Sequence, residues 1–142
     1  MAVCDIDPAR VDELVTRFDA EAVSPERLLD QHIDVFAPCA LGAVIREDNL
    51  SCLDVGVICG AANNQLENSS LAERLHHMGI VYIPDYLANG GGLIAGAEEY
   101  EASRAGRRFE IKQVNALIDT LDALCRGYLE QARDEDLSLI HI

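Results

Sequence analysis

The chain has 142 residues, of which 49% are hydrophobic and 25% charged, a composition typical of a folded domain with one core. Its 25 acidic and 11 basic residues give a formal net charge of -14 at pH 7, which argues against binding nucleic acid or an anionic membrane. The sequence contains no apolar run near the roughly 20 residues that span a bilayer, and no secretion signal, so we expect a cytoplasmic protein.

Apolar runs alternate with helical patterns through the first half of the chain. Asp7 and Ser24 each precede a proline, a pairing typical of a helix N-cap followed by the first helical position. Ser70 and Glu73 have the spacing of a capping box. Continuous apolar strands alternating with helices predict an α/β fold with a mostly parallel sheet covered on both faces. The expected strands are residues 1–6, 21–23, 33–38, 55–61 and 80–84, and the expected helices are 8–18, 25–31 and 71–78.

Two helices are expected in the second half, one from the glycine run at residues 90–92 to about Arg104 and one over residues 109–131. We therefore expect a partial dinucleotide-binding domain over residues 1–106 and a helical segment over 107–136. The tail LSLIHI, residues 137–142, is what a common transposase sequencing adapter encodes in frame, so we expect it to be read-through.

Two polar features are candidates for a binding site. Asp5 closes the first strand, as does the acid that accepts hydrogen bonds from the adenine ribose in dinucleotide-binding folds, although a simple turn residue would look the same. Asn63, Asn64 and Gln65 follow a buried strand, where open α/β sheets bind ligands and where carboxamides can hold another amide. A polar loop with an asparagine cap is the alternative.

Three glycines in a row weaken the start of a helix, so the presence of glycine at all of residues 90–92 requires a structural or functional explanation. The run does not match the G-x-G-x-x-G phosphate loop. It indicates either a close approach to a flat ring or close packing against another helix. The five cysteines form no C-x-x-C pair, so we expect free and mostly buried thiols, and no metal site.

Three stretches, FAPCALGAVI, CGAANNQL and GIVYIPDYLANGGGLI, together resemble the cofactor domain of the glutamate/leucine/phenylalanine/valine dehydrogenases, closest to the leucine dehydrogenase branch. The resemblance covers about residues 2–131 and implies a Rossmann-like, doubly wound sheet followed by C-terminal helices. It implies an NAD-dependent oxidative deamination of an L-amino acid to a 2-oxo acid and ammonia. The implied cofactor-binding residues are Asp5, Ile6, Cys39, Ala40, Ala61, Asn64 and Asn89, and the implied substrate-binding residues are Leu93 and Gly96.

The resemblance also implies parts that this sequence does not contain. In the family, the catalytic lysines lie in a preceding domain, and the first strand with its glycine-rich turn precedes the position of Met1. Lys112 is the single lysine here and lies in the last helix pattern. We therefore expect no catalytic residue in these 142 residues, no activity without the preceding domain, and a homo-oligomer for the full-length parent.

Gly90 stands where the family often has alanine, and Gly96 where branched-chain enzymes tend to carry a branched residue. The smaller residue at position 96 predicts a larger pocket, suited to larger apolar or aromatic amino acids. One alternative function is a non-catalytic module that senses NAD, which would account for Asp5 but not for the asparagines or the glycine run. A 2-hydroxy-acid dehydrogenase is another, but its proton-accepting histidine would have to lie at a strand end, where none is found.

Overall fold

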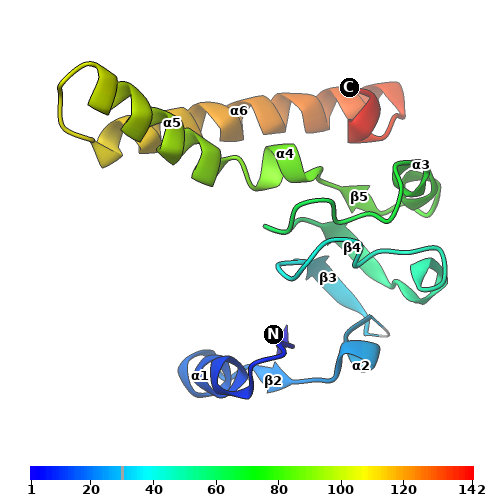
Figure 1. The fold of residues 1–142 in the computed structure, drawn as a ribbon. Helices are drawn as coiled ribbons and strands as arrows, with labels where there is room; N and C mark the ends of the chain where they lie inside the picture. The colour runs from blue at the N-terminus through cyan, green and yellow to red at the C-terminus, as the bar shows by residue number, and fades with distance from the viewer. Residues whose placement is uncertain (30) are drawn as a thin grey trace.

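The chain folds as an α/β protein with parallel strands, as the sequence predicts (Figure 1). The computed structural model describes residues 1–29 and 31–142. The strands form two parallel sheets rather than one continuous sheet: β1 pairs with β2, and β3, β4 and β5 follow one another in a second sheet. The strands are β1 (Ala2–Val3), β2 (Glu21–Ala22), β3 (Ile33–Phe36), β4 (Val55–Ile58) and β5 (Val81–Tyr82).

Helices connect and flank these strands. Figure 1 shows α1 beside β2 at the bottom, and the α5–α6 hairpin across the top, beyond the three-stranded sheet. The helices are α1 (Pro8–Phe18), α2 (Pro25–Leu29), α3 (Ser70–His77), α4 (Asp85–Ala88), α5 (Gly91–Arg104) and α6 (Ile111–Glu135), with 3-10 turns η1 (Leu50–Cys52) and η2 (Leu139–His141).

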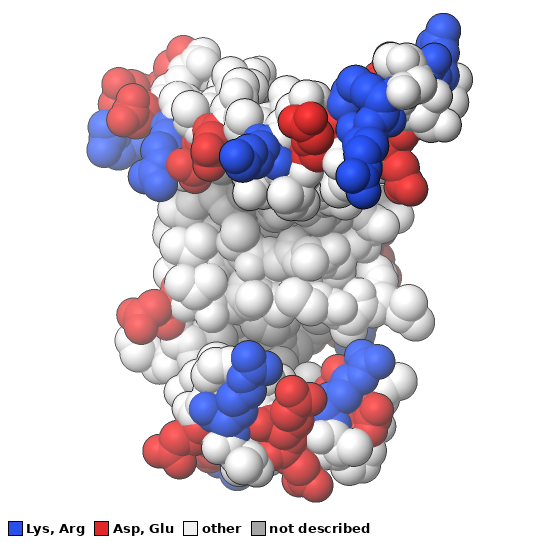
Figure 2. All heavy atoms as spheres, turned by 90° about the vertical axis from the view of Figure 1, so that its left-hand side faces the viewer, with Lys and Arg blue, Asp and Glu red and all other residues white. Residues whose placement is uncertain are grey.

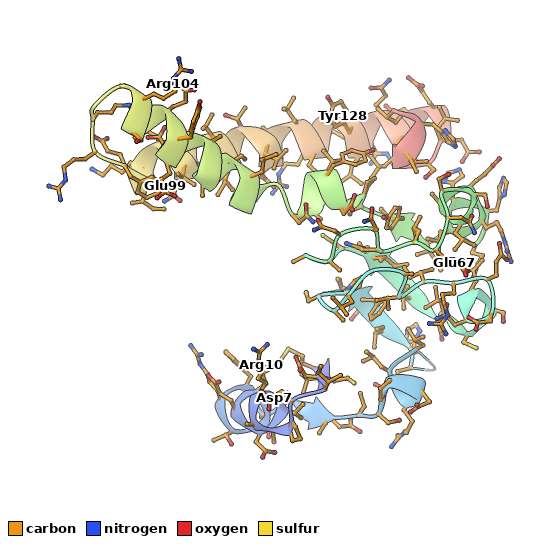
Figure 3. All side chains as sticks on the ribbon, in the orientation of Figure 1. Asp7, Arg10, Glu67, Glu99, Arg104 and Tyr128 are labelled. Carbon is orange, nitrogen blue, oxygen red and sulfur yellow. The ribbon has the colours of Figure 1, made fainter. Side chains whose placement is uncertain are left out.

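Local capping explains where the first helices begin. The Asp7 side chain accepts a hydrogen bond from Ala9 N–H at 3.0 Å, and Pro8 occupies the first helical position, which confirms the predicted cap. Figure 3 shows Asp7 and Arg10 together at this end of α1. The predicted capping box at Ser70 is wrong. Asn68 Oδ1 instead accepts from the Ser70 N–H at 3.1 Å, because an asparagine two residues earlier competes well for that donor.

The main core lies between the three-stranded sheet, α3 and the loop before β4. Its members are almost all aliphatic, so burial of apolar area is its chief stabilising contribution. Leu28 and Leu29 of α2 pack against it and connect the β1–β2 unit to the larger sheet. The most buried members are Ile45, Leu50, Ile58, Leu71, Ala72 and Leu75.

A second, smaller cluster joins the larger sheet to the base of α6. Ile83 at the end of β5 packs with Ala132 and Leu139. Leu139 belongs to the tail for which the sequence predicts read-through. Any short apolar segment can pack against an apolar surface, so its burial does not address its origin, and that prediction stays a prediction.

At the far end of the hairpin, an ion pair joins α5 to the turn before α6. Glu98 is 7% exposed, and its Oε2 accepts from Arg107 Nη2 at 2.8 Å. This guanidinium lowers the pKa of the Glu98 carboxyl. Figure 3 shows Glu99 and Arg104 at the same end, remote from the sheet.

All five cysteines are free, which confirms that part of the prediction, but the expected burial is wrong. Cys39 and Cys52 are exposed and the other three are half-buried, because the loops after β3 and before β4 turn outward. Within residues 1–29 and 31–142, no helix is long and apolar enough to cross a membrane. The same residues contain no group of three or more side chains placed to hold a metal ion.

Candidate functional site

The loop after β4 turns away from the sheet through a close contact with the end of β3. A Cβ atom built on Gly60 would lie 2.1 Å from the carbonyl oxygen of Pro38, so only glycine fits there. The same carbonyl accepts from Ala62 N–H at 3.0 Å. Gln65 lies fully buried inside the loop, with Nε2 donating to Gly60 O at 2.7 Å and to Ala62 O at 3.0 Å. Gln65 therefore braces the loop and does not present its amide to a ligand.

Asn64 is held in an unusual backbone conformation on this loop. Its φ is +50°, in the left-handed region that asparagine tolerates better than most residues. Its N–H donates to Asp85 Oδ2 at 2.6 Å, and its carbonyl accepts from Ala43 N–H at 2.7 Å. Contacts to two separate segments thus hold the Asn64 backbone, while the residue itself remains exposed.

Asn89, at the end of α4, connects the same loop to the glycine run. Its Nδ2 donates to Asn63 Oδ1 at 2.6 Å and is 3.3 Å from Ala61 O. The Asn63 and Asn89 side chains therefore hydrogen-bond to each other. This bond connects the two segments that follow the carboxyl ends of β4 and β5. Parallel α/β sheets bind their ligands at such ends.

A hollow of about 720 Å³ opens between these two segments. We call it the Asn89 hollow. In Figure 2, charged side chains gather at the top and bottom of the molecule, over the hairpin and the α1 unit, and the band between them is almost uncharged. The described lining contains one charged side chain, that of Asp85, and no cation. The lining residues are Ala61, Asn63, Asp85, Tyr86, Ala88, Asn89, Gly90, Gly91, Gly92 and Leu93.

Two tyrosines, Tyr86 in the lining of the hollow and Tyr82 on β5, keep their protons at neutral pH. Burial raises the pKa of Tyr82 to about 12, with smaller contributions from Asp85 and Tyr86. Burial also raises the pKa of Tyr86, helped by the nearby Asp85 carboxylate. Both hydroxyls are therefore neutral at pH 7.

The glycine run has two structural roles. A Cβ on Gly90 would lie 3.0 Å from Leu121 Cδ2 of α6, so this glycine allows close packing there, whereas a Cβ on Gly91 would make an ordinary contact at 3.7 Å with Ile118 Cδ1. A Cβ on Gly92 would meet nothing within 4 Å, and the same holds at Gly96. Gly90 therefore serves packing against α6, whereas Gly92 leaves open space along the hollow.

The structure brings some of the predicted site residues together and leaves others apart. Ala61, Asn89 and Leu93 line the Asn89 hollow, and Asn64 is attached to it through Asp85. Gly96 lies one helical turn further along α5 than Gly92. The remaining four predicted residues lie outside the lining: Asp5, Ile6, Cys39 and Ala40.

Asp5 belongs to the separate two-stranded unit, where its Oδ1 accepts from Asp7 N–H at 2.9 Å. Ile6, beside it, is fully exposed, and Cys39 and Ala40 are exposed on the loop after β3. The roles predicted for these residues stay predictions.

Sequence reasoning missed Asp85 and Tyr86 as members of the site. Both residues begin the short helix α4. Position in the chain could have identified Asp85, because it closely follows the end of β5, just as Asn63 and Asn64 follow the end of β4. Ligands bind at such strand ends. Its contact with Asn64, 21 positions earlier, could not be inferred from spacing.

Comparison with known proteins identifies a family for this fold and site. The model of the Glutamate/Leucine/Phenylalanine/Valine dehydrogenase family matches residues 4–141. A leucine dehydrogenase of Bacillus subtilis (strain 168) is 45% identical over 113 residues, which cover 78% of this chain and 31% of the relative. An L-tryptophan dehydrogenase of Nostoc punctiforme is 40% identical over 133 residues, covering 91% of this chain and 36% of the relative.

The crystal structure of L-tryptophan dehydrogenase from Nostoc punctiforme superposes with a TM-score of 0.79 at 36% identity, covering 99% of this chain and 40% of that one. The chain thus spans about a third of the length of the curated relatives it matches.

Proposed function

Because the chain belongs to the glutamate/leucine/phenylalanine/valine dehydrogenase family, we propose that it is the cofactor-binding part of an NAD-dependent amino-acid dehydrogenase. The proposed reaction is the oxidative deamination of an L-amino acid with an apolar side chain to a 2-oxo acid and ammonia. NAD, when bound, supplies the acceptor for the hydride that leaves the α-carbon. The catalytic lysines and the water-activating half of the cleft are proposed to come from a preceding domain, and the full-length parent is proposed to be a homo-oligomer.

The Asn89 hollow is the observation that supports this proposal best. It is large enough for a nicotinamide ring with part of a substrate, and its lining is nearly uncharged, which suits an uncharged carboxamide group. The open space over Gly92 lets a flat ring approach the backbone of α5. These residues therefore fit the nicotinamide end of the cofactor.

Asn64, Asn89 and Asp5 each have a binding role in this proposal, and none of them is catalytic. Asn64, its backbone fixed through Asp85, would direct its carboxamide toward the nicotinamide and its ribose. Asn89 would hold the rim of the hollow by its bond to Asn63. Asp5 would accept from the adenine-ribose hydroxyls, and its negative charge favours NAD because it would repel the 2′-phosphate of NADP.

A titration of the chain with NAD and with NADP, followed by amide NMR shifts, tests cofactor binding. We expect NAD to move the Asn64, Asn89 and Gly92 amides more than NADP does at equal concentration. Asn89→Ala should weaken this response, whereas Asn115→Ala, on the exposed surface of α6, should leave it unchanged. Shifts confined to other parts of the chain would contradict the proposed site.

Substrate size is proposed to depend on Leu93 and Gly96. Leu93 lines the hollow and is 80% exposed, and the space above Gly96 is open. A side chain larger than leucine could occupy that space. A chimera in which residues 1–136 replace the corresponding part of the Nostoc punctiforme L-tryptophan dehydrogenase would report this preference as kcat/KM.

We expect that chimera to prefer phenylalanine to valine, and Gly96→Val to reduce the preference by about tenfold, since filling a pocket by a few methyl groups changes discrimination by about 1–3 kcal/mol. Gly127→Val, at an open position on α6, is the control for the loss of a helical glycine. A chimera that binds NAD and folds but does not turn over would instead support a sensing module.

A further inference from the structure

We propose that Asp85 and Tyr86 make the Asn89 hollow favour the oxidised, cationic form of the nicotinamide ring over the reduced, neutral form. The inference rests on the proposed function, because it takes the nicotinamide end of NAD as the occupant of the hollow. It goes beyond that proposal by assigning to these two side chains a discrimination between the two redox states of the cofactor.

The first observation is that the negative charge of Asp85 has no partner cation. Its Oδ2 accepts from Asn64 N–H at 2.6 Å and its Oδ1 accepts from Tyr86 N–H at 2.9 Å, and both donors are neutral backbone groups. Among the residues that the structure describes, the ion pairs do not include Asp85. Two donors therefore hold the carboxylate in place, and its charge remains free to act on a molecule in the hollow.

This charge already acts on neighbouring side chains. The pKa of Tyr82 and the pKa of Tyr86 are both raised, first by burial and then by the Asp85 carboxylate. The carboxylate thus disfavours a second negative charge beside it. A positive charge in the same surroundings is favoured, because the sign of the electrostatic interaction reverses.

The second observation is an aromatic side chain in the same lining. Tyr86 lines the hollow and is 58% exposed, so its ring is available to a bound molecule. A cation over the face of an aromatic ring is attracted by the quadrupole of that ring, and a neutral molecule lacks this attraction. Tyr86 therefore adds to the preference in the same direction as Asp85.

The two forms of the nicotinamide ring differ by one positive charge, because addition of a hydride converts the pyridinium into a neutral dihydropyridine. Apart from Asp85, the described lining consists of small, apolar and carboxamide residues with Tyr86, so no charge there opposes that of Asp85. The attraction from Asp85 and Tyr86 acts on the oxidised ring and is lost on the reduced one. It therefore favours the entry of NAD and the departure of NADH.

The dissociation constants of NAD and NADH for the 142-residue chain test this inference. Both are measured by NMR titration at one pH and one ionic strength, from the amide shifts of Asn64, Asn89 and Gly92. The two ligands share their adenine, riboses and phosphates, so a variant that only disturbs the site weakens both to the same extent. The ratio Kd(NADH)/Kd(NAD) therefore reports the effect of the ring charge.

Asp85→Asn removes the charge and keeps one acceptor oxygen. We expect it to lower the ratio about fivefold, because opposite charges near a protein surface attract several times more strongly than in water. The same change raises the reduction potential of the bound cofactor by about 20 mV. Asp12→Asn is the matched control, since Asp12 is an exposed acid on α1 and is not part of the hollow. It should leave the ratio unchanged.

A second pair of variants tests the aromatic ring. Tyr86→Leu removes the ring, and we expect it to lower the ratio about threefold, the effect of one cation–π contact at an exposed site. Tyr86→Phe keeps the ring and should leave the ratio unchanged. Equal ratios for these two variants would overturn the role of Tyr86.

Three results would overturn the role of Asp85 and leave the proposed function standing. One is an unchanged ratio in Asp85→Asn with NAD still bound at the hollow, and another is an equal fall in Asp12→Asn. The third is a ratio for the native chain that does not fall between about 0.01 M and about 1 M salt, a measurement that needs no variant to fold. If neither NAD nor NADH moved the amides of the hollow, the proposed function would be contradicted together with this inference.

Discussion

Replacing Asp85 by alanine should loosen the loop that carries Asn64. The Asp85 carboxylate accepts from Asn64 N–H at 2.6 Å through Oδ2 and from Tyr86 N–H at 2.9 Å through Oδ1. The first bond joins segments 21 positions apart and stabilises a left-handed residue, while the second lies within the start of α4. Asp85→Ala removes both acceptors.

The size of the effect follows from the kind of bond and its exposure. A hydrogen bond to a charged group contributes about 1.5–3 kcal/mol. Asp85 is half-buried and Asn64 is exposed, so water partly replaces the lost contacts and we expect a cost of about 1–2 kcal/mol. With an unfolding slope of about 1.5 kcal/mol per molar urea, the midpoint should fall by about 1 M. Asp85→Asn keeps one acceptor oxygen and should lose about half as much.

Urea unfolding followed by circular dichroism measures the stability, and the amide NMR spectrum reports the local change. We expect the Asn64 amide to shift strongly in Asp85→Ala. Asp122→Ala is the matched control, since Asp122 is exposed and, among the described residues, its carboxylate bonds only to Arg126 on the same helix. If Asp85→Ala and Asp122→Ala had equal urea midpoints and the Asn64 amide resonance did not move, the proposed role of Asp85 in holding the Asn64 loop would be refuted.

Two further predictions concern stability. Gly60→Ala should destabilise the chain by about 1–3 kcal/mol, because the new Cβ meets the Pro38 backbone, whereas Gly127→Ala should stabilise it by about 0.5–1 kcal/mol, because nothing lies within 4 Å of that position on α6. Urea midpoints of the two variants in the wrong order would contradict this. The pKa of Tyr82, raised from an ordinary value near 10 to about 12, means that the neutral form stabilises the fold below pH 10 and that this contribution is lost as the pH rises through 10 to 12. Tyr82→Phe should therefore lose less stability than the native chain between about pH 9 and about pH 12, and equal losses would show that Tyr82 does not carry this dependence.

Local chemistry determined much of the fold before any contact was known. Asp7 caps α1 because a short carboxylate followed by proline satisfies a free N–H and presets the backbone. The β-branched run around Val57 forms a strand inside a parallel sheet for a similarly local reason. The Ser70 box failed because two nearby side chains competed for one donor. Such competition is decided by small differences in geometry that the spacing of residues does not contain.

The sequence by itself determined the α/β class, the order of the strands and of every helix except α4, and the family, because these depend on periodicity, caps and motifs that are close together in the chain. Tertiary structure alone decided that Asp85 holds Asn64, that Asn89 holds Asn63, and that Gly90 faces Leu121. It also decided that the strands form two sheets, one of β1 and β2 and the other of β3, β4 and β5. Each of these contacts joins segments 21 to 31 positions apart, and such contacts depend on how whole elements pack, which local residue patterns do not encode.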